Sequence, residues 1–366
     1  MDRLDTAAVP RYPRLAPPMA GGRSTLEPAL ARLGDVPAVT GRIRACPEDF
    51  QVEEDLGFAP DGNGEHFLIQ IRKRDCNTPW VARELARIAE VPARDVSYAG
   101  LKDRHAVAVQ WFSIRVPGTR EPDWAQLEGD ALQVLSVSRH RRKLRRGALH
   151  GNRFRILLRE PQGPWDDLER RVARVARSGV PNYFGPQRFG LQYGNVTAAQ
   201  AWFRGDTRAP DRLRRGLYLS AARAHLFNTV LTRRVQAGDW DRLLPGEVAM
   251  LEGTHSVFAV PQPDAVLERR AAQGDVHPTG PLWGAGGSRV TGHCAEVEAA
   301  ALAGETTLRA GLEAAGLRAE RRTLRVMVPA LRLARVADGA EFEFRLPAGA
   351  YATTVLRELV HLETEA

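Results

Sequence analysis

The sequence predicts a mixed α/β fold in which a mostly helical segment interrupts a domain built on a sheet. Strand-like alternation of apolar and polar residues is frequent before about residue 160 and returns after about residue 325, whereas the chain between them reads mostly as helices. The 366 residues exceed one average core but suit two domains, and a hydrophobic content of 43% is enough to fill them. We therefore expect a discontinuous α/β domain with a helical insertion.

The first predicted strands follow an N-terminal segment rich in proline and arginine. Residues 1–40 lack the apolar centre of a secretory signal, and we interpret them as a flexible arm. A short strand, a turn at Pro47 and a strand through Phe50 follow. The turn signal DGNG at 61–64 precedes a strong alternating strand over 65–74.

A helix and two further strands complete this first region. Thr78 suits an N-cap position, Pro79 suits the first helical position, and the apolar spacing predicts a helix that ends near residue 91. Residues 96–99 and 107–116 read as strands. The run Gly100 to His105 between them reads as a loop.

Helices dominate the centre of the sequence. Residues 166–178 predict a helix with acids in the first turn and Gly179 after the last. Two more are expected within 219–238 and 294–316, and the Pro/Gly-rich run 277–289 is expected to be a loop. The tail returns to strands at 323–330 and 341–349 and closes with a helix over 353–363.

The charge distribution favours a nucleic-acid partner. The formal net charge is +8, and residues 139–159 contain nine Lys or Arg and no acid. A solvated basic face is the alternative interpretation. Phe154 and Ile156 alternate with Arg153 and Arg155, which is typical of a strand with one cationic face, and that geometry suits phosphate contacts.

Several common sites are not indicated. No lysine follows a glycine, so no phosphate-binding loop of the Walker type is present, and GAGGSR at 284–289 follows no predicted strand. The histidines lack metal spacing. Three widely spaced cysteines without a CxxC pair argue against structural zinc and favour the cytoplasm. No apolar run approaches the length of about 18 residues that a membrane span needs.

Asp103 is the strongest candidate for chemistry. Only three of the 52 basic residues are lysines, and one of them, Lys102, directly precedes Asp103, which Arg104 and His105 follow. A turn aspartate that bonds its own loop is one interpretation. The other is a carboxylate kept ionised by cations, as a nucleophile or general base requires. Its ion-pair partner need not be a sequence neighbour, because successive side chains in extended chain diverge.

The run SYAGLKDRHAVAVQWFS at 97–113 closely resembles the signature of the TruD-type tRNA pseudouridine synthases. Six more blocks resemble that family in its order: PEDFQVEEDLGFAPDGNGEHFLIQI, CNTPWVARELA, RHRRKLRRGALHGNRF, GVPNYFGPQRFG, LSAARAHLFN and LPAGAYATTVLREL. The resemblance implies an α+β fold with a mixed, largely antiparallel sheet. It also implies a catalytic domain at 41–177 and 326–366, interrupted by a mostly helical family-specific domain at 178–325.

The resemblance implies an activity and a set of site residues. Members convert uridine at position 13 of certain tRNAs to pseudouridine without a metal or organic cofactor, and Asp103 aligns with their catalytic aspartate. The sequence leaves open whether this carboxylate attacks the sugar, adds to the base or removes a ribose proton. The expected substrate contacts are Arg44, Phe50, Lys102, Asn152, Phe154 and Tyr351, and the expected RNA-backbone contacts are Arg141, Arg142, Lys143, Arg145 and Arg146.

Three departures from the family pattern stand out. Arg44 stands where some relatives carry Lys, and either residue could pair with Asp103. Leu101 replaces a polar residue seen in some relatives. Tyr351 stands where Phe is common, so its hydroxyl needs a partner if buried.

Two competing interpretations are an RNA-binding protein without turnover and a different base- or glycosyl-chemistry enzyme. Retention of Asp103 argues against the first, and the missing zinc-deaminase motif argues against the second. We expect a monomer that acts on tRNA, with no membrane and no protein partner.

Overall fold

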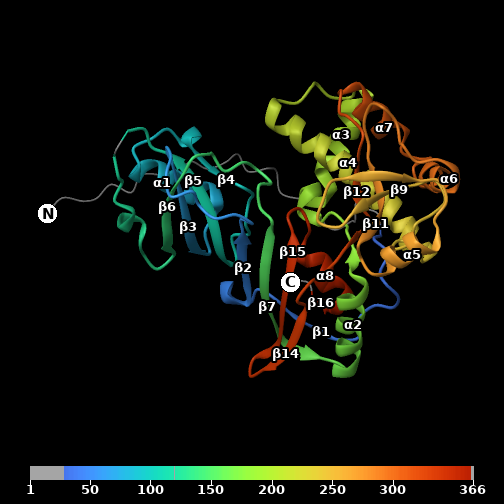
Figure 1. The fold of residues 1–366 in the computed structure, drawn as a ribbon, viewed down its shortest axis with the longest axis horizontal. Coiled ribbons are helices and arrows are strands. Elements are labelled where there is room, and N and C mark those ends of the chain that lie inside the picture. Colours follow the sequence, from blue (N-terminus) through green and yellow to red (C-terminus); the bar gives the residue numbers. More distant parts are fainter. Residues whose placement is uncertain (1–28, 119, 364–366) are drawn as a thin grey trace.

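The protein is described by a computed structural model covering residues 29–118 and 120–363. Three groups of elements follow one another across the molecule (Figure 1). Residues 50–140 form one end, residues 151–178 and 332–362 form the middle, and residues 194–323 form the other end. No helix in the described part of the chain is both long and apolar enough to cross a membrane.

A ten-stranded sheet links the first two groups. Its main path runs β14-β15-β7-β2-β5-β3-β6, and β1, β4 and β16 pair at its sides. The strands are β1 (Thr40–Arg42), β2 (Phe50–Asp55), β3 (His66–Arg74), β4 (Val96–Tyr98), β5 (Val107–Arg115), β6 (Leu132–His140), β7 (Gly151–Gln162), β14 (Arg332–Val336), β15 (Gly339–Pro347) and β16 (His361–Leu362). Among the strand pairs that the described residues form in this sheet, only β2–β5 and β1–β16 are parallel, so the predicted mixed, largely antiparallel sheet is confirmed.

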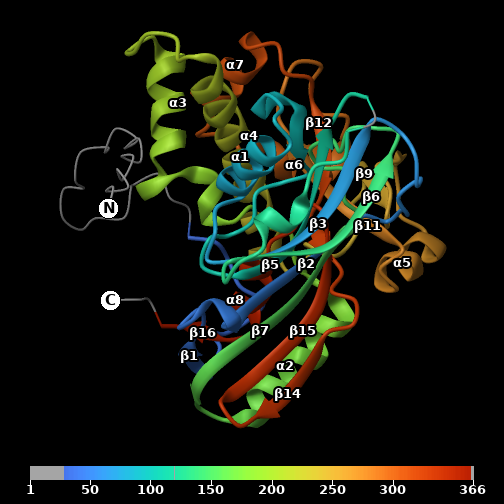
Figure 2. The same cartoon turned by 90° about the vertical axis from the view of Figure 1, so that its left-hand side faces the viewer.

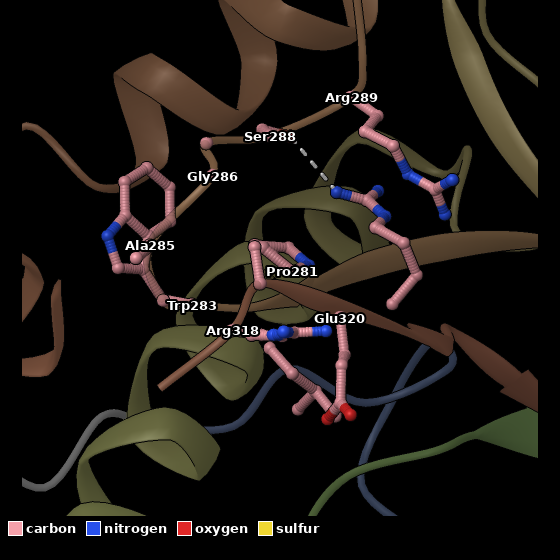
Figure 3. A pocket seen from close by; sticks show the side chains of 13 residues that line it. Pro281, Trp283, Ala285, Gly286, Ser288, Arg289, Arg318 and Glu320 are labelled. Atoms are coloured by element: carbon pink, nitrogen blue, oxygen red, sulfur yellow. Dashed lines mark hydrogen bonds between the residues drawn. The ribbon is translucent and has the colours of Figure 1, made fainter. Parts of the chain in front are cut away.

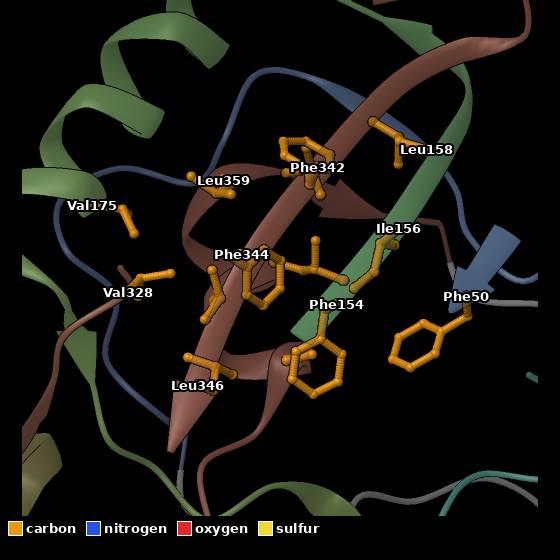
Figure 4. Packing of buried hydrophobic residues seen from close by; sticks show 14 of the residues in the cluster. Phe50, Phe154, Ile156, Leu158, Val175, Val328, Phe342, Phe344, Leu346 and Leu359 are labelled. Carbon is orange, nitrogen blue, oxygen red and sulfur yellow. The ribbon is translucent and has the colours of Figure 1, made fainter. Parts of the chain in front are cut away.

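The middle of the sheet packs against two helices. Figure 2 shows β7, β15 and β14 side by side with α2 (Trp165–Ser178) along them. Side chains from these strands meet α2 and α8 (Ala352–Leu359) in one buried cluster (Figure 4). As predicted, α2 has acids in its first turn and ends at Gly179, whose φ of 70° suits glycine.

The prediction that Thr78 caps α1 (Thr78–Ile88) is wrong by one residue, because Asn77 is the N-cap. Thr78 is instead the first helical residue, and its buried hydroxyl has other partners. Its Oγ1 donates to Oε1 of Gln110 at 2.9 Å and accepts from the backbone N–H of Lys102 at 3.1 Å. Thr78 therefore joins the start of α1 to the Asp103 loop.

The third group combines helices with a second sheet that the sequence analysis did not predict. The helices are α3 (Gly194–Arg204), α4 (Arg212–Ala237), α5 (Ala265–Ala272), α6 (Gly292–Ala301) and α7 (Thr306–Ala314). The sheet has the order β10-β9-β11-β12 and consists of β9 (Glu247–Leu251), β10 (Val257–Val260), β11 (Val276–Leu282) and β12 (Glu320–Thr323).

The prediction of a loop over 277–289 is wrong for its first part, because β11 is a buried strand. It pairs with β9 up to Pro278 and with β12 from Thr279 onward, so each half is paired on one side only. A strand paired in this way tolerates proline, which cannot donate to a ladder. GAGGSR therefore does follow a strand, although β11 and β12 are antiparallel and form no dinucleotide-binding βαβ unit.

The chain enters and leaves the third group at one place. There β8 (Val180–Pro181) pairs with β13 (Arg325–Val326). No strand of the ten-stranded sheet comes from the residues between them. This distribution agrees with boundaries near 178 and 325, and the division into domains stays a prediction.

Part of the predicted N-terminal arm is attached to the protein. Residues 1–28 lie outside the described residues, but Arg357 donates from Nη1 and Nη2 to the carbonyls of Ala31 and Leu30 at 3.0 and 2.9 Å. The backbone N–H of Leu33 donates to Oε2 of Glu358 at 2.8 Å. The segment from residue 30 is thus held on α8, so the arm is not free chain up to residue 40.

Candidate active site

Asp103 lies on the loop between β4 and β5, in the ten-stranded sheet. β5 pairs at its start with β2 and at its end with β4, so the loop returns to the sheet beside the start of β2, where Val107 opposes Gln51. The side-chain amide of Gln110 holds the loop by donating to the carbonyl of Gly100 at 2.7 Å. The Asp103 side chain is 29% exposed, so its carboxylate is constrained but accessible.

Both carboxylate oxygens of Asp103 have partners from distant segments. Nη2 of Arg44 lies 2.7 Å from Oδ2, and Nε2 of Gln187 lies 2.8 Å from Oδ1. Arg44 follows β1, and Gln187 belongs to the 3₁₀ turn Pro186–Phe189 of the 178–325 segment. The carboxylate is therefore fixed by a cation on one side and an amide on the other.

The basic residues next to Asp103 in sequence contact other acids. Lys102 Nζ lies 2.6 Å from Oε1 of buried Glu54. Arg104 and His105 both reach Oδ1 of Asp75, at 3.5 and 3.0 Å. The alternation of side chains in extended backbone explains this divergence. Lys102 thus anchors the loop to β2 through Glu54. This geometry does not support the predicted substrate contact.

A buried lysine supports the same loop and was missed by the sequence analysis. Lys73 is fully buried, and its Nζ donates to the carbonyl oxygens of Asp103 at 2.9 Å and Cys76 at 2.6 Å. Burial lowers the pKa of Lys73 to about 8. The sequence could have indicated that Lys73 is buried, because this lysine, one of three, continues the alternation of buried residues Phe67, Ile69 and Ile71.

Aromatic rings form a wall close to the Asp103–Arg44 pair. The Arg44 guanidinium lies over the Phe50 ring, 4.2 Å from its centroid. Phe154 meets Phe50 edge-on at 6.1 Å and stacks on Phe344 at 5.4 Å between centroids (Figure 4). Phe50 and Phe154 are only 3% and 7% exposed, so most of both rings is covered by protein.

Asn152 carries an unused acceptor on the same strand as Phe154. The two residues are two positions apart on β7, so their side chains share a face. Oδ1 of Asn152 is buried and accepts no hydrogen bond from the described residues. A buried amide oxygen without a partner is costly, which makes it a candidate for binding a ligand N–H.

Tyr351 contacts the segment that carries Gln187. Its hydroxyl accepts from Nη2 of Arg188 at 3.0 Å, which supplies the partner that a buried hydroxyl needs. Phe184 meets its ring edge-on at 6.3 Å. A Cβ on Gly185 would lie 3.1 Å from the Tyr351 ring, so any larger residue there would push against this ring.

The expected RNA-backbone residues lie on the exposed loop between β6 and β7. Within the described chain, none of the five forms an ion pair: Arg141, Arg142, Lys143, Arg145 and Arg146. Four of them line a hollow of about 750 Å³ together with Phe58 and His140. The N–H of Gly147 donates to the carbonyl of Ala99 at 2.8 Å, so this loop adjoins the Asp103 loop.

The strand part of the basic stretch does not form the predicted cationic face. Arg155 Nε lies 2.7 Å from Oε2 of Glu341, and Arg153 Nη2 lies 3.6 Å from Oε2 of Glu343. Acids on the neighbouring strand β15 therefore neutralise both arginines. Within the basic stretch 139–159, the arginines and the lysine that form no ion pair with a described residue therefore lie in the loop before β7.

The fold and the sequence are those of an enzyme, as comparison with known proteins shows. Residues 31–209 and 197–359 match the family model described as tRNA pseudouridine synthase D (TruD). A tRNA pseudouridine synthase D of Methylococcus capsulatus is 51% identical over 326 residues, covering 89% of this chain and 92% of that protein. One of Nitrosococcus oceani is 50% identical over 337 residues, covering 91% and 94%.

A solved structure shares the fold. The crystal structure of the putative tRNA pseudouridine synthase D of Methanosarcina mazei matches with a TM-score of 0.70 and 24% identity, over 90% of this chain and 95% of that one. The chain belongs to the tRNA pseudouridine synthase D family, which confirms the resemblance found in the sequence.

Proposed function

We propose that the protein isomerises uridine to pseudouridine in tRNA, with Asp103 as the catalytic carboxylate and position 13 as the target. The observation that carries this proposal is the accessible Asp103 carboxylate, held through one oxygen by Arg44 and through the other by Gln187. An ionised carboxylate of fixed orientation suits nucleophilic or general-base work. Family membership supports the same reaction.

The reaction replaces the glycosidic bond at N1 of uracil by one at C5, so the detached uracil must stay bound in the site. The bond from the ribose to N1 of uracil breaks, the detached base rotates, and a new bond forms from the same ribose carbon to C5. The hydrogen on C5 leaves as a proton and N1 takes up a proton, so the product is an isomer of the substrate. Asp103 serves as the nucleophile toward the sugar or the base, or removes a ribose proton. In each case the 2.7 Å ion pair with Arg44 holds the carboxylate in a fixed orientation.

We assign recognition of the uracil to Asn152 and the aromatic wall. The free Oδ1 of Asn152 can accept a hydrogen bond from N3–H of uracil, a donor that the base keeps throughout the reaction. Phe154 and Phe50 supply ring surface against a flipped base. Because both rings are nearly covered, an entering base must displace the Arg44 guanidinium from above Phe50.

We assign tRNA positioning to the loop between β6 and β7. Its unpaired cations lie beside the Asp103 loop and suit phosphate contacts, which position RNA without reading sequence. The protein acts as a monomer in the cytoplasm in this proposal, which accords with three free cysteines.

Tritium release from tRNA labelled at uracil C5 tests the proposal. Wild-type protein should release tritium, and Asp103→Asn should bind the same tRNA but release none. Mass measurement would miss the product, because pseudouridine and uridine have equal mass. Tight, salt-dependent tRNA binding without release from any tRNA would overturn the isomerase and favour an RNA-binding protein.

A further inference from the structure

A second hollow, of about 450 Å³, lies where the chain after β11 meets the chain leading into β12 (Figure 3). Its lining includes Trp283, Gly286, Gly287, Arg289 and Arg318, and we call it the Trp283 pocket. The pocket lies in the 178–325 segment and shares no lining residue with the aspartate site. Neither the sequence analysis nor the family assignment gives it a role.

One side of the Trp283 pocket is suited to an anion. Arg289 and Arg318 are exposed, and neither forms an ion pair with a described residue. The backbone N–H groups of 286–289 donate to no described group. Gly286 and Gly287 have φ values of 102° and 70°, a conformation that favours glycine. Consecutive free N–H groups beside guanidinium groups form a typical oxyanion site.

The other side offers a rigid aromatic ring. Nε1 of Trp283 donates to Oε1 of Glu313 at 2.8 Å, which fixes the indole. The Arg309 guanidinium lies 4.4 Å from its ring centroid. Figure 3 shows the indole and the Arg289 and Arg318 side chains around the same hollow. A held indole is a good platform for a nucleobase, and every base has a face that can stack on it.

Hydrogen bonds through α4 connect the pocket to the turn that carries Gln187. Arg223 on α4 donates from Nη2 to the carbonyl of Arg318 at 2.8 Å. Ser220, one helical turn earlier and about 5 Å along the axis, accepts from Nη1 of Arg188 at 2.9 Å. The other nitrogen of Arg188 donates to Tyr351. One RNA chain can therefore reach both sites.

We infer that the Trp283 pocket binds one unpaired nucleotide of the RNA substrate. Its phosphate is held by Arg289, Arg318 and the N–H groups of 286–289, and its base stacks on Trp283. An anion alone would use the arginines but not the indole, and an apolar ligand would leave the two guanidinium groups unpaired. The inference rests on the proposed function, because it places a second nucleotide of the same tRNA.

The test compares two double variants of the full-length protein. Arg289→Ala with Arg318→Ala removes the anion side. Arg233→Ala with Arg269→Ala is the matched control. It removes two exposed arginines from the same segment that lie outside the pocket and form no ion pair with a described residue. Filter binding to one transcribed tRNA should show about tenfold weaker binding for the pocket variant and less than about threefold for the control.

The indole is tested on its own. Trp283→Leu should weaken tRNA binding about fivefold or more, and Trp283→Phe should restore most of the loss, since a smaller ring still stacks. Thermal unfolding of each variant identifies any loss that comes from misfolding. The exposed arginine variants test the pocket even if Trp283→Leu is unstable.

Three outcomes decide the inference. Equal loss in both double variants would overturn it, because general charge would then explain binding. A second result would also overturn it: wild-type protein binds uridine monophosphate in calorimetry, and the pocket variant loses this binding but binds tRNA unchanged. The pocket would then be a site for free nucleotides. Selective loss of tRNA binding supports it, even if wild-type protein releases no tritium, in which case only the isomerase proposal fails.

Discussion

Lys73 allows a quantitative test of how a buried cation supports the Asp103 loop. Its ammonium donates to two backbone carbonyls, and no carboxylate among the described residues forms an ion pair with it. Burial lowers its pKa from the ordinary 10.5 to about 8. We expect Lys73→Met to change the free energy of unfolding in a pH-dependent way, and to reduce turnover about tenfold because the Asp103 carbonyl loses its donor.

The sign follows from the proton balance. Between about pH 8 and pH 10.5 the unfolded chain keeps Lys73 protonated while the folded protein does not, so stability rises with pH in this window. The cost of charging the buried amine is fully present below about pH 8. One pKa unit corresponds to about 1.4 kcal/mol, so the whole effect is on the order of 3 kcal/mol. The Lys73→Met variant has no amine at this position and therefore lacks this pH-dependent cost.

Urea unfolding at several pH values from about 7 to about 10 measures this effect. Wild-type protein should gain stability relative to Lys73→Met as pH rises, by on the order of 2 kcal/mol over this range. Lys143→Met, which removes an exposed lysine on the basic loop, is the matched control. A constant difference between wild type and Lys73→Met across the range would refute the reasoning.

Three further predictions concern the groups around the site. Gln187→Ala removes one of the two partners of the Asp103 carboxylate, so single-turnover rates should fall about tenfold while tRNA affinity stays within about twofold. Tyr351→Phe leaves Arg188 without one acceptor and should lower stability by about 1 kcal/mol in thermal unfolding, with turnover retained. Replacing three loop arginines by alanine, at Arg141, Arg142 and Arg145, should reduce the slope of log affinity against log salt concentration for tRNA by about 2 to 3. An unchanged slope would contradict their phosphate contacts.

The sheet could be predicted well because its signal is local. Strands β3 and β5 alternate apolar and polar residues, and their predicted bounds differ from the observed ones by one residue at most. β11 could not be predicted, because its residues are buried on both faces and its two prolines resemble loop signals. Its strand character depends on β9 and β12, which are distant in sequence.

The site residues also differ in how far the sequence could predict them. Asp103 could be predicted from a short run, and Arg44 was expected as its partner only through the family resemblance. Lys102 was expected to contact the substrate, but its side chain leaves the loop on the side of Glu54. Gln187 had no local signal, because a glutamine in an exposed turn becomes informative only when packing places it 2.8 Å from the carboxylate.

The origin of these partners constrains how the site assembles. Arg44 and Asp103 come from the first part of the chain, whereas Gln187 and Arg188 come from the segment after β8. Arg188 binds Tyr351, which precedes α8 in the C-terminal part. The turn Pro186–Phe189 therefore ties the carboxylate to the segment that carries the Trp283 pocket. The route from the Trp283 pocket to the carboxylate therefore runs through Arg223 and Ser220 on α4, and then through the turn that carries Arg188 and Gln187.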